Sequence, residues 1–341
     1  MLFKAWVYRD FNSAYRLEIV DRPELKLEDS QVRVAIRGVS LNYRDVIALK
    51  NKAGRKVDGR IAASDGSGEI IEIGKSVTEW RVGDRVAGCF FPTWKSGRFD
   101  LGYHREDLGG SLDGMLAEQV VVDQDGLVEI PNQLSFAEAA TLPCAAVTAW
   151  HALVIRGSLQ SGQTVLVLGT GGVSIFALQI ANAMGAKVIV TSSSDEKLEK
   201  AKAMGAWATI HYGREPDWDR EVWKLTDGKG VDHVVETGGP GTLERSMKSI
   251  AAEGKIALIG VLTGFGPPTA SLFPLLARNV SLNGIYVGSR QHFKELNQFL
   301  TQSKIHPVID SQFAFDEAPT AFESLEDARH FGKIVIKGLH A

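Results

Sequence analysis

The stretch from Val165 to Leu198, VLVLGTGGVSIFALQIANAMGAKVIVTSSSDEKL, predicts a strand, a turn, a helix and a second strand. The apolar run Val165 to Leu168 is typical of a strand buried on both faces, and Gly169 permits a sharp turn because it lacks a Cβ. Apolar residues then recur at helical spacing, which predicts a helix that packs on this strand and ends at Gly185. Lys187 to Thr191 completes the unit as a second strand. Unpaired N–H groups at the start of this helix would bind an anion, most simply a dinucleotide pyrophosphate.

The composition is that of an ordinary globular protein, and 341 residues predict about two domains. There are 38 Lys and Arg against 41 Asp and Glu, so the net charge of −3 gives no basic surface for nucleic acid. Residues 1–10 lack the apolar core of a signal peptide, and no stretch approaches the ~20 apolar residues that span a bilayer, so we expect a cytoplasmic protein. The only cysteines, Cys89 and Cys144, argue against a disulfide framework or a thiolate-built zinc site.

The N-terminal third predicts a small, irregular β-barrel of short strands with glycine corners. The expected strands are Phe3 to Val7, Leu17 to Val20, Val32 to Val39, Gly68 to Ile73 and Arg85 to Ala87. Residues 90–114, FFPTWKSGRFDLGYHREDLGGSLDG, interrupt this pattern with a long aromatic and glycine-rich segment. Such a segment is either a packed lobe, which we favour, or a contributor to a substrate pocket.

The rest of the chain alternates strands and helices, as in a doubly wound, mostly parallel sheet. Ser135, with Glu138 three residues later, predicts a capped helix ahead of the apolar stretch Ala139 to Leu153. Further strands are expected at Ala208 to His211, Val231 to Val235, Ile256 to Gly260, Val280 to Gly288 and Lys333 to Lys337, and helices at Pro216 to Leu225, Thr242 to Ile250 and Phe293 to Gln302. We therefore predict a dinucleotide-binding domain at 146–288 and a second domain of residues 1–145 and 289–341, where the final segment returns to the barrel.

Gly169, Gly171 and Gly172 are weak evidence alone, but their context strengthens them. They follow a buried strand and open an amphipathic helix within a βαβ unit, as a dinucleotide-binding motif requires. With Val173 they are expected to contact the cofactor. Ser174 stands where the usual G-x-G-x-x-G has its third glycine, and its small side chain still permits close packing. Dinucleotide binding is therefore preferred over a purely structural turn.

The end of the second strand favours NADPH over NADH. Ser192 and Ser193 stand where an NAD-specific site carries Asp or Glu for the ribose 2′-hydroxyl. Hydroxyl donors, with Lys197 one turn further, suit a 2′-phosphate instead. The alternative is that Ser193 caps the next helix with Glu196 as its capping-box partner, and that Lys197 is merely solvated. Both interpretations can hold together.

Two later strand ends add candidate cofactor residues. Gly238 and Gly239 follow the fourth strand and Gly260 the fifth, at the carboxyl edge where ligands of open α/β sheets bind. Val261 and Leu262 come next and are expected to line the nicotinamide.

The whole chain resembles the medium-chain dehydrogenase/reductase superfamily and, within it, the zinc-free quinone-oxidoreductase-like branch of zeta-crystallin relatives. The segments that carry the resemblance are GVSLNYRD (38–45), AASDGSGEI (62–70), LPCAAVTAWHAL (142–153), VLVLGTGGVS (165–174) and GKIVIKG (332–338). The resemblance implies a GroES-like β-barrel catalytic domain plus a Rossmann nucleotide-binding domain, with the nicotinamide bound between them. It also implies a homodimer that pairs sheet edges near Asn283 and Gly284.

The resemblance further implies that both zinc sites of the family's alcohol dehydrogenases are lost. Where those enzymes bind catalytic zinc through two cysteines and a histidine, this chain has Asn42, Ser64 and Cys144, and amides and hydroxyls are poor zinc ligands. Residues 90–114 contain none of the four cysteines of the structural zinc lobe. Cys144 is then expected to be a small buried apolar residue. Without zinc to deprotonate an alcohol, hydride delivery to an electrophile is the easier reaction.

The resemblance suggests catalytic roles for three residues, each with a structural alternative. Asn42 would hold the cofactor ribose or polarise a carbonyl, or it would only cap the helix that follows, with Asp45 at the third position. Tyr43 would donate to a substrate oxygen or, more simply, pack as an aromatic ring. Asp65, next to the position of the lost zinc histidine, would act in catalysis or be a turn residue.

The resemblance assigns three further positions, Thr148, Tyr212 and Lys333, to the cofactor. Thr148 would contact the nicotinamide, or be an ordinary helix residue. His151, one turn further, suggests a proton relay, but a core histidine is preferred. Tyr212 would lie against the adenosine or its 2′-phosphate, or face solvent, and Lys333 would lie near the nicotinamide end.

The sequence therefore predicts an NADPH-dependent oxidoreductase that transfers hydride to a quinone or an α,β-unsaturated carbonyl without zinc. The alternatives are an NAD(P)-dependent alcohol dehydrogenase of the same superfamily and a dinucleotide-binding protein with a structural or regulatory role. The expected partners are a small electrophilic substrate and a second copy of the chain, with no nucleic acid and no membrane.

Overall fold

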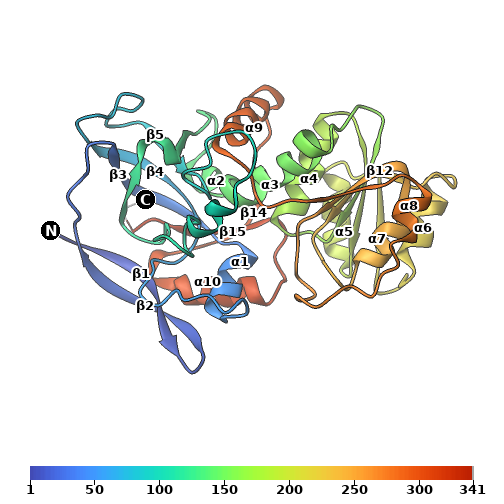
Figure 1. The fold of residues 1–341 in the computed structure, drawn as a ribbon, viewed down its shortest axis with the longest axis horizontal. Helices are drawn as coiled ribbons and strands as arrows, with labels where there is room; N and C mark the ends of the chain where they lie inside the picture. Colours follow the sequence, from blue (N-terminus) through green and yellow to red (C-terminus); the bar gives the residue numbers. More distant parts are fainter. Residues whose placement is uncertain (340–341) are drawn as a thin grey trace. The chain divides into compact units, whose positions relative to one another are not determined.

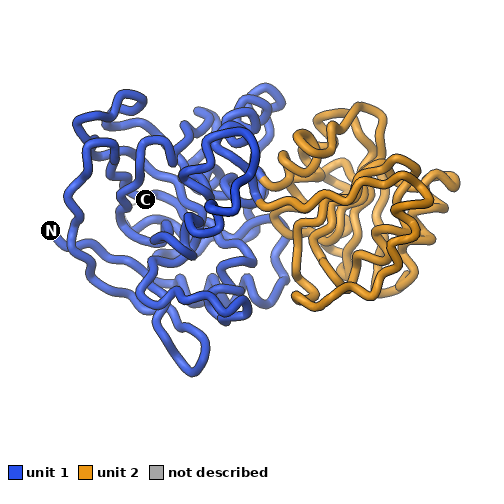
Figure 2. The backbone as a smooth tube through the Cα atoms, viewed as in Figure 1, with its two compact units in different colours: residues 1–147, 287–341 blue, residues 148–286 orange. Residues whose placement is uncertain are grey.

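The computed structural model describes residues 1–339, which fold into two compact units. The first unit comprises Met1–Val147 with Val287–Ala341, and the second unit is Thr148–Tyr286 (Figure 2). The sequence predicted that the two segments of the first domain end at residue 145 and resume at residue 289, and in the structure they end at 147 and resume at 287. Each unit contains its own cluster of buried apolar side chains.

The second unit is built on a six-stranded parallel sheet, which confirms the predicted Rossmann-like fold (Figure 1). In sheet order its strands are β10 (Ala208–His211), β9 (Lys187–Ser192), β8 (Thr164–Leu168), β11 (Val231–Glu236), β12 (Ile250–Leu258) and β13 (Ser281–Gly284). Numbered along the chain within this unit, that order is 3-2-1-4-5-6, the arrangement of dinucleotide-binding folds. The strand order therefore reverses between β8 and β11, where such sheets bind their ligands.

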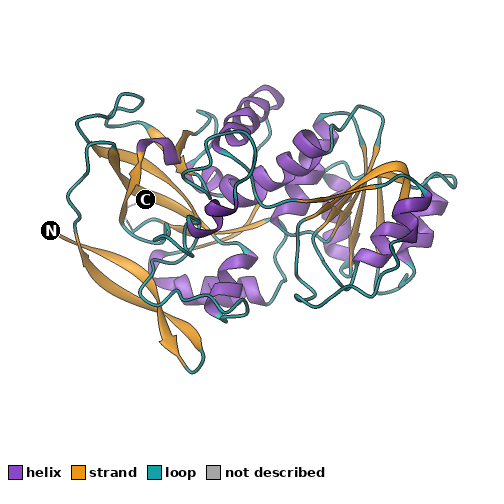
Figure 3. Cartoon of the chain, viewed as in Figure 1, coloured by secondary structure: helices purple, strands orange, loops and turns teal. Residues whose placement is uncertain are grey.

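Helices lie on both sides of this sheet, so its central strands are buried on both faces (Figure 3). They are α4 (Gly172–Ala183), α5 (Asp195–Ala203), α6 (Trp218–Leu225), α7 (Leu243–Ser249) and α8 (Phe273–Ala277). The helix predicted after the glycine turn is α4, and Gly185 follows its end with a φ of 79°. Strand β13 is shorter than predicted, because pairing with β12 stops at Gly284.

The first unit contains a seven-stranded sheet, consistent with the predicted GroES-like fold. Six strands follow the order β14 (Ile309–Phe313), β15 (Lys333–Lys337), β3 (Gln31–Ser40), β4 (Asp65–Ile73), β5 (Arg85–Gly88) and β7 (Leu127–Glu129), and β6 (Gln119–Asp123) also pairs with β3. β1 (Leu2–Phe11) and β2 (Ala14–Pro23) form a separate hairpin. Because β15 pairs with β3, the C-terminal segment returns to the N-terminal sheet, as predicted.

The helices of this unit are short apart from those in the C-terminal segment. They are α1 (Tyr43–Leu49), α2 (Phe136–Ala140), α9 (Arg290–Ser303) and α10 (Ala318–Glu326), and α3 (Val147–Trp150) begins at the limit of the unit. Ser135 caps α2 as predicted: its Oγ accepts from Glu138 N–H at 3.2 Å, and the Glu138 carboxylate accepts from Ser135 N–H at 2.8 Å. The apolar stretch beyond it includes π-helical turns at Leu142–Ala146 and His151–Arg156.

Residues 90–114 form a packed lobe, the interpretation favoured from the sequence. Phe91, Trp94 and Phe99 contact one another at ring-centroid distances of 5.1–6.2 Å. Asp107 anchors the lobe: its fully buried carboxylate accepts from the guanidiniums of Arg44, at 2.5 Å, and Arg55, at 2.6 and 3.0 Å. In residues 1–339 no helix is both long and apolar enough to cross a bilayer.

Candidate functional site

The glycine turn after β8 leaves the start of α4 open. Gly169 has a φ of 72°, and Gly171 is the N-cap residue of α4 without a side chain to accept from its first N–H groups. A Cβ built at either glycine would meet no atom within 4 Å. The open space beside free helical N–H groups at the switch point fits a dinucleotide pyrophosphate.

Ser174, the departure from the glycine motif, has a structural role. Its buried Oγ donates to the carbonyl of Leu168 at 2.7 Å, which ties the first turn of α4 to the end of β8. The Thr237 hydroxyl also donates to the Leu168 carbonyl, at 3.0 Å. Hydrogen bonds to side chains on both flanking elements therefore fix the strand end below the glycine turn.

The end of β9 carries the serines, but the capping residue differs from the prediction. Ser194, not Ser193, caps α5: its Oγ accepts from Lys197 N–H at 3.4 Å. The chain bends one residue later than expected because β9 continues through Ser192, whose Oγ accepts from Ser194 N–H at 3.2 Å. Ser193 is exposed and no longer needed as a cap, and the proposed Glu196 capping box does not form.

Tyr212 lies beside this strand end, since its N–H donates to the Ser192 carbonyl at 3.0 Å. Tyr212 as a whole is 44% exposed. Sequence reasoning missed Arg214, two residues further, whose exposed guanidinium forms an ion pair with Asp195. A basic residue just after the strand next to β9 was the available signal. Serine hydroxyls, an aromatic ring and a guanidinium therefore occur at adjacent strand ends.

Glu236 is a second residue that sequence reasoning missed, although an acid just before Gly238 and Gly239 was the available signal. Its fully buried carboxylate accepts from the N–H groups of both glycines, at 2.8 and 2.9 Å, and from the hydroxyl of Thr242 at 2.6 Å. It therefore fixes the turn after β11, on the other side of the switch point. Gly260 is required by packing, because a Cβ there would lie 1.6 Å from the Thr237 carbonyl oxygen.

The remaining cofactor candidates of the second unit have mixed environments. Thr148 and His151 are buried, and Leu262 is 53% exposed. Val173 lies in the first turn of α4, and Val261 follows β12. Their contacts with a cofactor stay predictions.

The first unit gathers Asn42, Ser64, Asp65 and Lys333 into one buried polar cluster. The strand register brings them together, because Ser40 at the end of β3 pairs with Asp65 on one side and Val335 on the other. Lys333 Nζ donates to Asn42 Oδ1 at 2.6 Å and to the Leu41 carbonyl at 2.5 Å.

The hydrogen bonds continue from Asn42 to the carboxylate. Asn42 Nδ2 lies 3.4 Å from Ser64 Oγ, and Ser64 Oγ donates to Asp65 Oδ1 at 2.7 Å. The backbone N–H of Cys144 donates to Asp65 Oδ2 at 2.9 Å. Asp65 is thus the first residue of β4 and not a turn residue. We call Asn42, Ser64, Asp65 and Lys333 the Asn42 cluster.

Burial opposes charge in this cluster. It raises the pKa of Asp65 and lowers the pKa of Lys333, and their mutual attraction offsets part of each effect. Burial, followed by the Asp65 carboxylate, raises the pKa of the Cys144 thiol. The Cys144 residue as a whole is half-buried, but its thiol lies in the same low-dielectric environment as Asp65.

The structural alternatives predicted for Asn42 and Tyr43 are both present. Asn42 caps α1, and the Asp45 carboxylate accepts from its backbone N–H at 2.8 Å. The Asn42 side chain is instead bonded within the Asn42 cluster, and its catalytic role stays a prediction. Tyr43 is half-buried against the core, and Lys52 Nζ lies 3.4 Å from its hydroxyl. A substrate contact of this hydroxyl stays a prediction.

The donor chemistry of the Asn42 cluster does not fit zinc. Ser64 donates to Asp65 and Asn42 accepts from an ammonium, so among these side chains the Asp65 carboxylate and the nearby Cys144 thiol are the two that could bind zinc. Zinc requires deprotonated sulfur, neutral imidazole or carboxylate ligands. Across residues 1–339, no three His, Cys, Asp or Glu side chains converge as a metal site.

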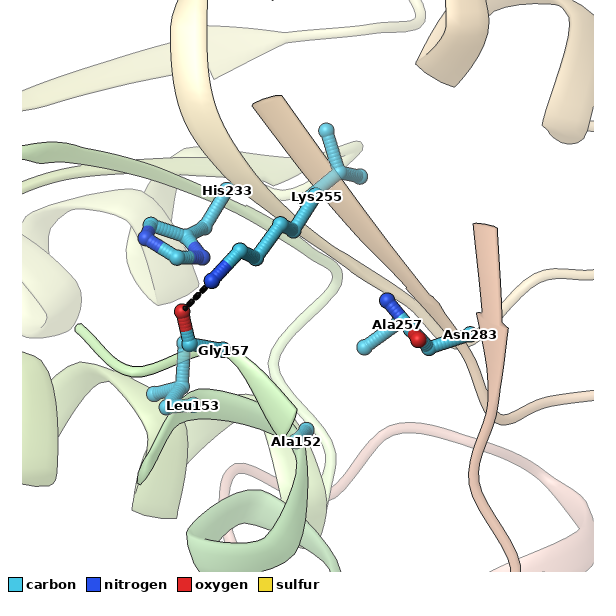
Figure 4. A pocket seen from close by; sticks show the side chains of 8 residues that line it. Ala152, Leu153, Gly157, His233, Lys255, Ala257 and Asn283 are labelled. Carbon is cyan, nitrogen blue, oxygen red and sulfur yellow. Dashed lines mark hydrogen bonds between the residues drawn. The ribbon is translucent and has the colours of Figure 1, made fainter. Parts of the chain in front are cut away.

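A small cavity in the second unit is not a substrate site. His233, Lys255 and Asn283 help to line it, and Lys255 Nζ donates to the Gly157 carbonyl at 2.7 Å (Figure 4). Its volume is about 10 Å³, which holds at most one water molecule. Substrate binding must therefore use other surfaces.

Comparison with known proteins supports the fold described for each unit. Residues 28–132 match the family model "Alcohol dehydrogenase GroES-like domain", and residues 172–302 match "Zinc-binding dehydrogenase". A zinc-type alcohol dehydrogenase-like protein of Schizosaccharomyces pombe is 42% identical, over 92% of each chain. A quinone oxidoreductase-like protein 2 homolog of Nematostella vectensis is 33% identical, over 91% of this chain and 82% of that protein.

Solved structures give the same assignment. A Sinorhizobium meliloti protein named provisionally as an alcohol dehydrogenase superimposes with a TM-score of 0.93 at 41% identity, over 98% of each chain. A Pseudomonas syringae quinone oxidoreductase gives 0.82 at 27% identity, over 99% of this chain and 100% of that one. The fold, the open glycine turn and these relatives together show that the chain is an oxidoreductase of the medium-chain dehydrogenase/reductase superfamily.

Proposed function

We propose that this oxidoreductase transfers hydride from NADPH to a quinone or an α,β-unsaturated carbonyl without zinc. The Asn42 cluster is the observation that carries the proposal. It contains a buried amide and a buried hydroxyl, Asn42 and Ser64, where zinc-containing relatives are expected to hold metal ligands, and a buried ammonium, Lys333, that donates to the amide. Such a site provides hydrogen-bond donors for a developing oxyanion, but no group that strongly acidifies an alcohol.

The chemistry that a bound nicotinamide supplies is hydride transfer to an electrophilic carbon. The hydride's electron pair forms the new C–H bond, and the π electrons of the electrophile shift towards the substrate oxygen, which becomes an oxyanion or enolate. The Asn42 amide donates a hydrogen bond to this oxygen and stabilises its charge. Water then supplies the proton that completes the reduction.

The preference for NADPH is supported by the ends of β9 and β10. No carboxylate stands at Ser192 or Ser193, and Arg214 provides a guanidinium two residues after Tyr212. Asp195 holds this guanidinium only in an exposed ion pair, which is weak in water. A 2′-phosphate, with its greater charge, can therefore compete for Arg214 through two parallel hydrogen bonds.

The test combines both cofactors with quinones, enones, aldehydes and alcohols, and follows the nicotinamide absorbance. NADPH consumption with quinones or enones but not with aldehydes is the expected result. Metal analysis of the purified protein runs in parallel, and one equivalent of tightly held zinc would contradict the zinc-free part. Cofactor binding without turnover of any substrate would favour a structural or regulatory role.

A second candidate is an NAD(P)-dependent alcohol dehydrogenase. The relatives' names support it, since the S. pombe protein is called zinc-type alcohol dehydrogenase-like and a 33% identical solved structure is called NAD-dependent alcohol dehydrogenase. Alcohol-driven formation of NADH or NADPH in the same panel would favour this candidate.

We also propose that two copies of the chain pair through β13. This strand ends the six-stranded sheet, and its outer edge has no partner strand among residues 1–339. Exposed apolar side chains lie on or near it, at Leu272, Phe273, Leu276 and Leu282. Sedimentation of the purified protein as a monomer at micromolar concentration would contradict this proposal.

The two free cysteines are consistent with a reducing, cytoplasmic location.

A further inference from the structure

Lys333 is a buried cation with two hydrogen-bond acceptors in the first unit. It is 3% exposed at the start of β15, and its ammonium donates to Asn42 Oδ1 and to the Leu41 carbonyl. Burying an unpaired ammonium is costly, so the surrounding groups must compensate for its charge. Asp65 is the nearby carboxylate available for this, because Asp45 is already paired with Arg44 at 3.2 Å.

The ammonium decides which way the Asn42 amide faces. An ammonium has three donors and no acceptor, so only the amide oxygen can face it. The amide nitrogen must then face the other way, and it lies 3.4 Å from Ser64 Oγ. Without the charge at position 333, either end of the amide could face the Leu41 side of the site.

The charge also strengthens Asn42 as a donor. A charge-assisted hydrogen bond to Oδ1 polarises the amide, and a polarised amide donates more strongly through its N–H groups. The N–H groups are the part of Asn42 that a substrate oxyanion requires.

We propose that Lys333 is a positioning residue, which orients and polarises the Asn42 amide so that its nitrogen donates to the substrate oxygen. This inference rests on the proposed function, because it deepens the role assigned there to Asn42. It differs from the expectation that position 333 serves the cofactor, since the ammonium is bonded within the first unit.

The test is a double-mutant cycle of Lys333→Met and Asn42→Ala, with Lys333→Arg as the conservative variant. We expect Asn42→Ala to lower kcat for quinone reduction by about 100- to 1000-fold, typical of one lost oxyanion donor, and Lys333→Met to lower it by at most the same factor. The double variant should be no slower than Asn42→Ala, because Lys333 acts through Asn42. Lys333→Arg should recover part of the loss, and the NADPH Kd should change less than about twofold throughout.

Two results would overturn the inference. One is losses that multiply in the double variant, which would mean that Lys333 acts independently of Asn42. The other is a weakened NADPH Kd with kcat unchanged in Lys333→Met, which would make Lys333 a cofactor ligand. If Lys333→Met does not fold, Lys333→Gln, which keeps a neutral donor, takes its place in the cycle with the same expectations.

A second readout separates this inference from the proposed function. The side-chain NH₂ signals of Asn42 in a proton–nitrogen NMR spectrum are identified by their loss in Asn42→Ala. They should shift in Lys333→Met even if the wild-type protein reduces no quinone, which would refute only the proposed function. Unchanged Asn42 signals in Lys333→Met would refute the orientation of the amide by Lys333, whatever the substrate.

Discussion

The glycine turn allows a prediction that separates cofactor binding from folding. Gly171 has a φ of −75° and a ψ of −178°, which alanine adopts without strain, and a Cβ there would meet no atom within 4 Å. Gly171→Ala should gain about 0.4–1 kcal/mol from the stiffer unfolded chain and lose a similar amount because alanine is a poorer N-cap than glycine. The free energy of unfolding should therefore change by less than about 1 kcal/mol.

Cofactor binding should respond much more. The new methyl group would occupy the open space beside the first N–H groups of α4, where the pyrophosphate is expected. A hydrogen bond to a charged group contributes about 1.5–3 kcal/mol. Loss of one such bond should therefore raise the Kd for NADPH by about 10- to 100-fold.

The assay is titration with NADPH, followed by fluorescence, alongside urea unfolding of the same protein. Gly266→Ala is the matched control, because a Cβ at Gly266 would also meet no atom within 4 Å and its φ is not left-handed. A folded Gly171→Ala protein that binds NADPH within twofold of wild type would refute the placement of the pyrophosphate. Equal weakening in Gly266→Ala would show that the effect is not local.

Three further predictions concern other parts of the chain. Ser192→Asp should move the cofactor preference towards NADH, because a carboxylate repels the 2′-phosphate, and an unchanged ratio of kcat/KM for the two cofactors would count against NADPH specificity. Burial lowers the pKa of His233 from 6.5 to about 4, so the unfolded state binds a proton at a higher pH than the folded state does. The free energy of unfolding should therefore fall by up to about 3 kcal/mol as the pH drops from 6.5 to 4. His233→Gln should unfold with a correspondingly weaker pH dependence, and an identical dependence would contradict the assignment. Asp107→Asn removes the charge that pairs with Arg44 and Arg55, and it should lower the free energy of unfolding by about 2–3 kcal/mol. This is less than for a fully buried ion pair, since both arginines reach solvent. The exposed control Asp58→Asn should change the free energy of unfolding by under about 1 kcal/mol.

Local sequence patterns were sufficient to predict the strands, turns and helices that depend mainly on interactions between residues close in the sequence. The run Val165–Leu168, the glycines and the apolar helix spacing predicted β8 and α4 within one residue of the observed strand and helix starts. Capping followed the same logic at Ser135, but the pattern failed at Ser193, since three consecutive serines give three possible caps. The length of β9, set by its pairing with β8 and β10, selected Ser194.

Elements whose formation depends on distant partners were missed. β14 has few apolar residues, and its hydrogen bonds come from pairing with β15. Glu236 gave no repeating pattern, because its partners are backbone N–H groups and hydroxyls of one turn. Arg214 was recognisable only once β10 and β9 were adjacent.

The sequence by itself determined the strand–helix–strand unit and its glycine turn, because short-range periodicity and glycine geometry specify these features, and its motifs carried the resemblance to the superfamily. Only the tertiary structure decided what surrounds Asn42. Asn42, the pair Ser64 and Asp65, and Lys333 lie in three separate segments of the chain, and they meet because β4 and β15 both pair with the end of β3. The orientation of the Asn42 amide follows from that meeting, since a buried ammonium only donates hydrogen bonds and the amide oxygen must therefore face it.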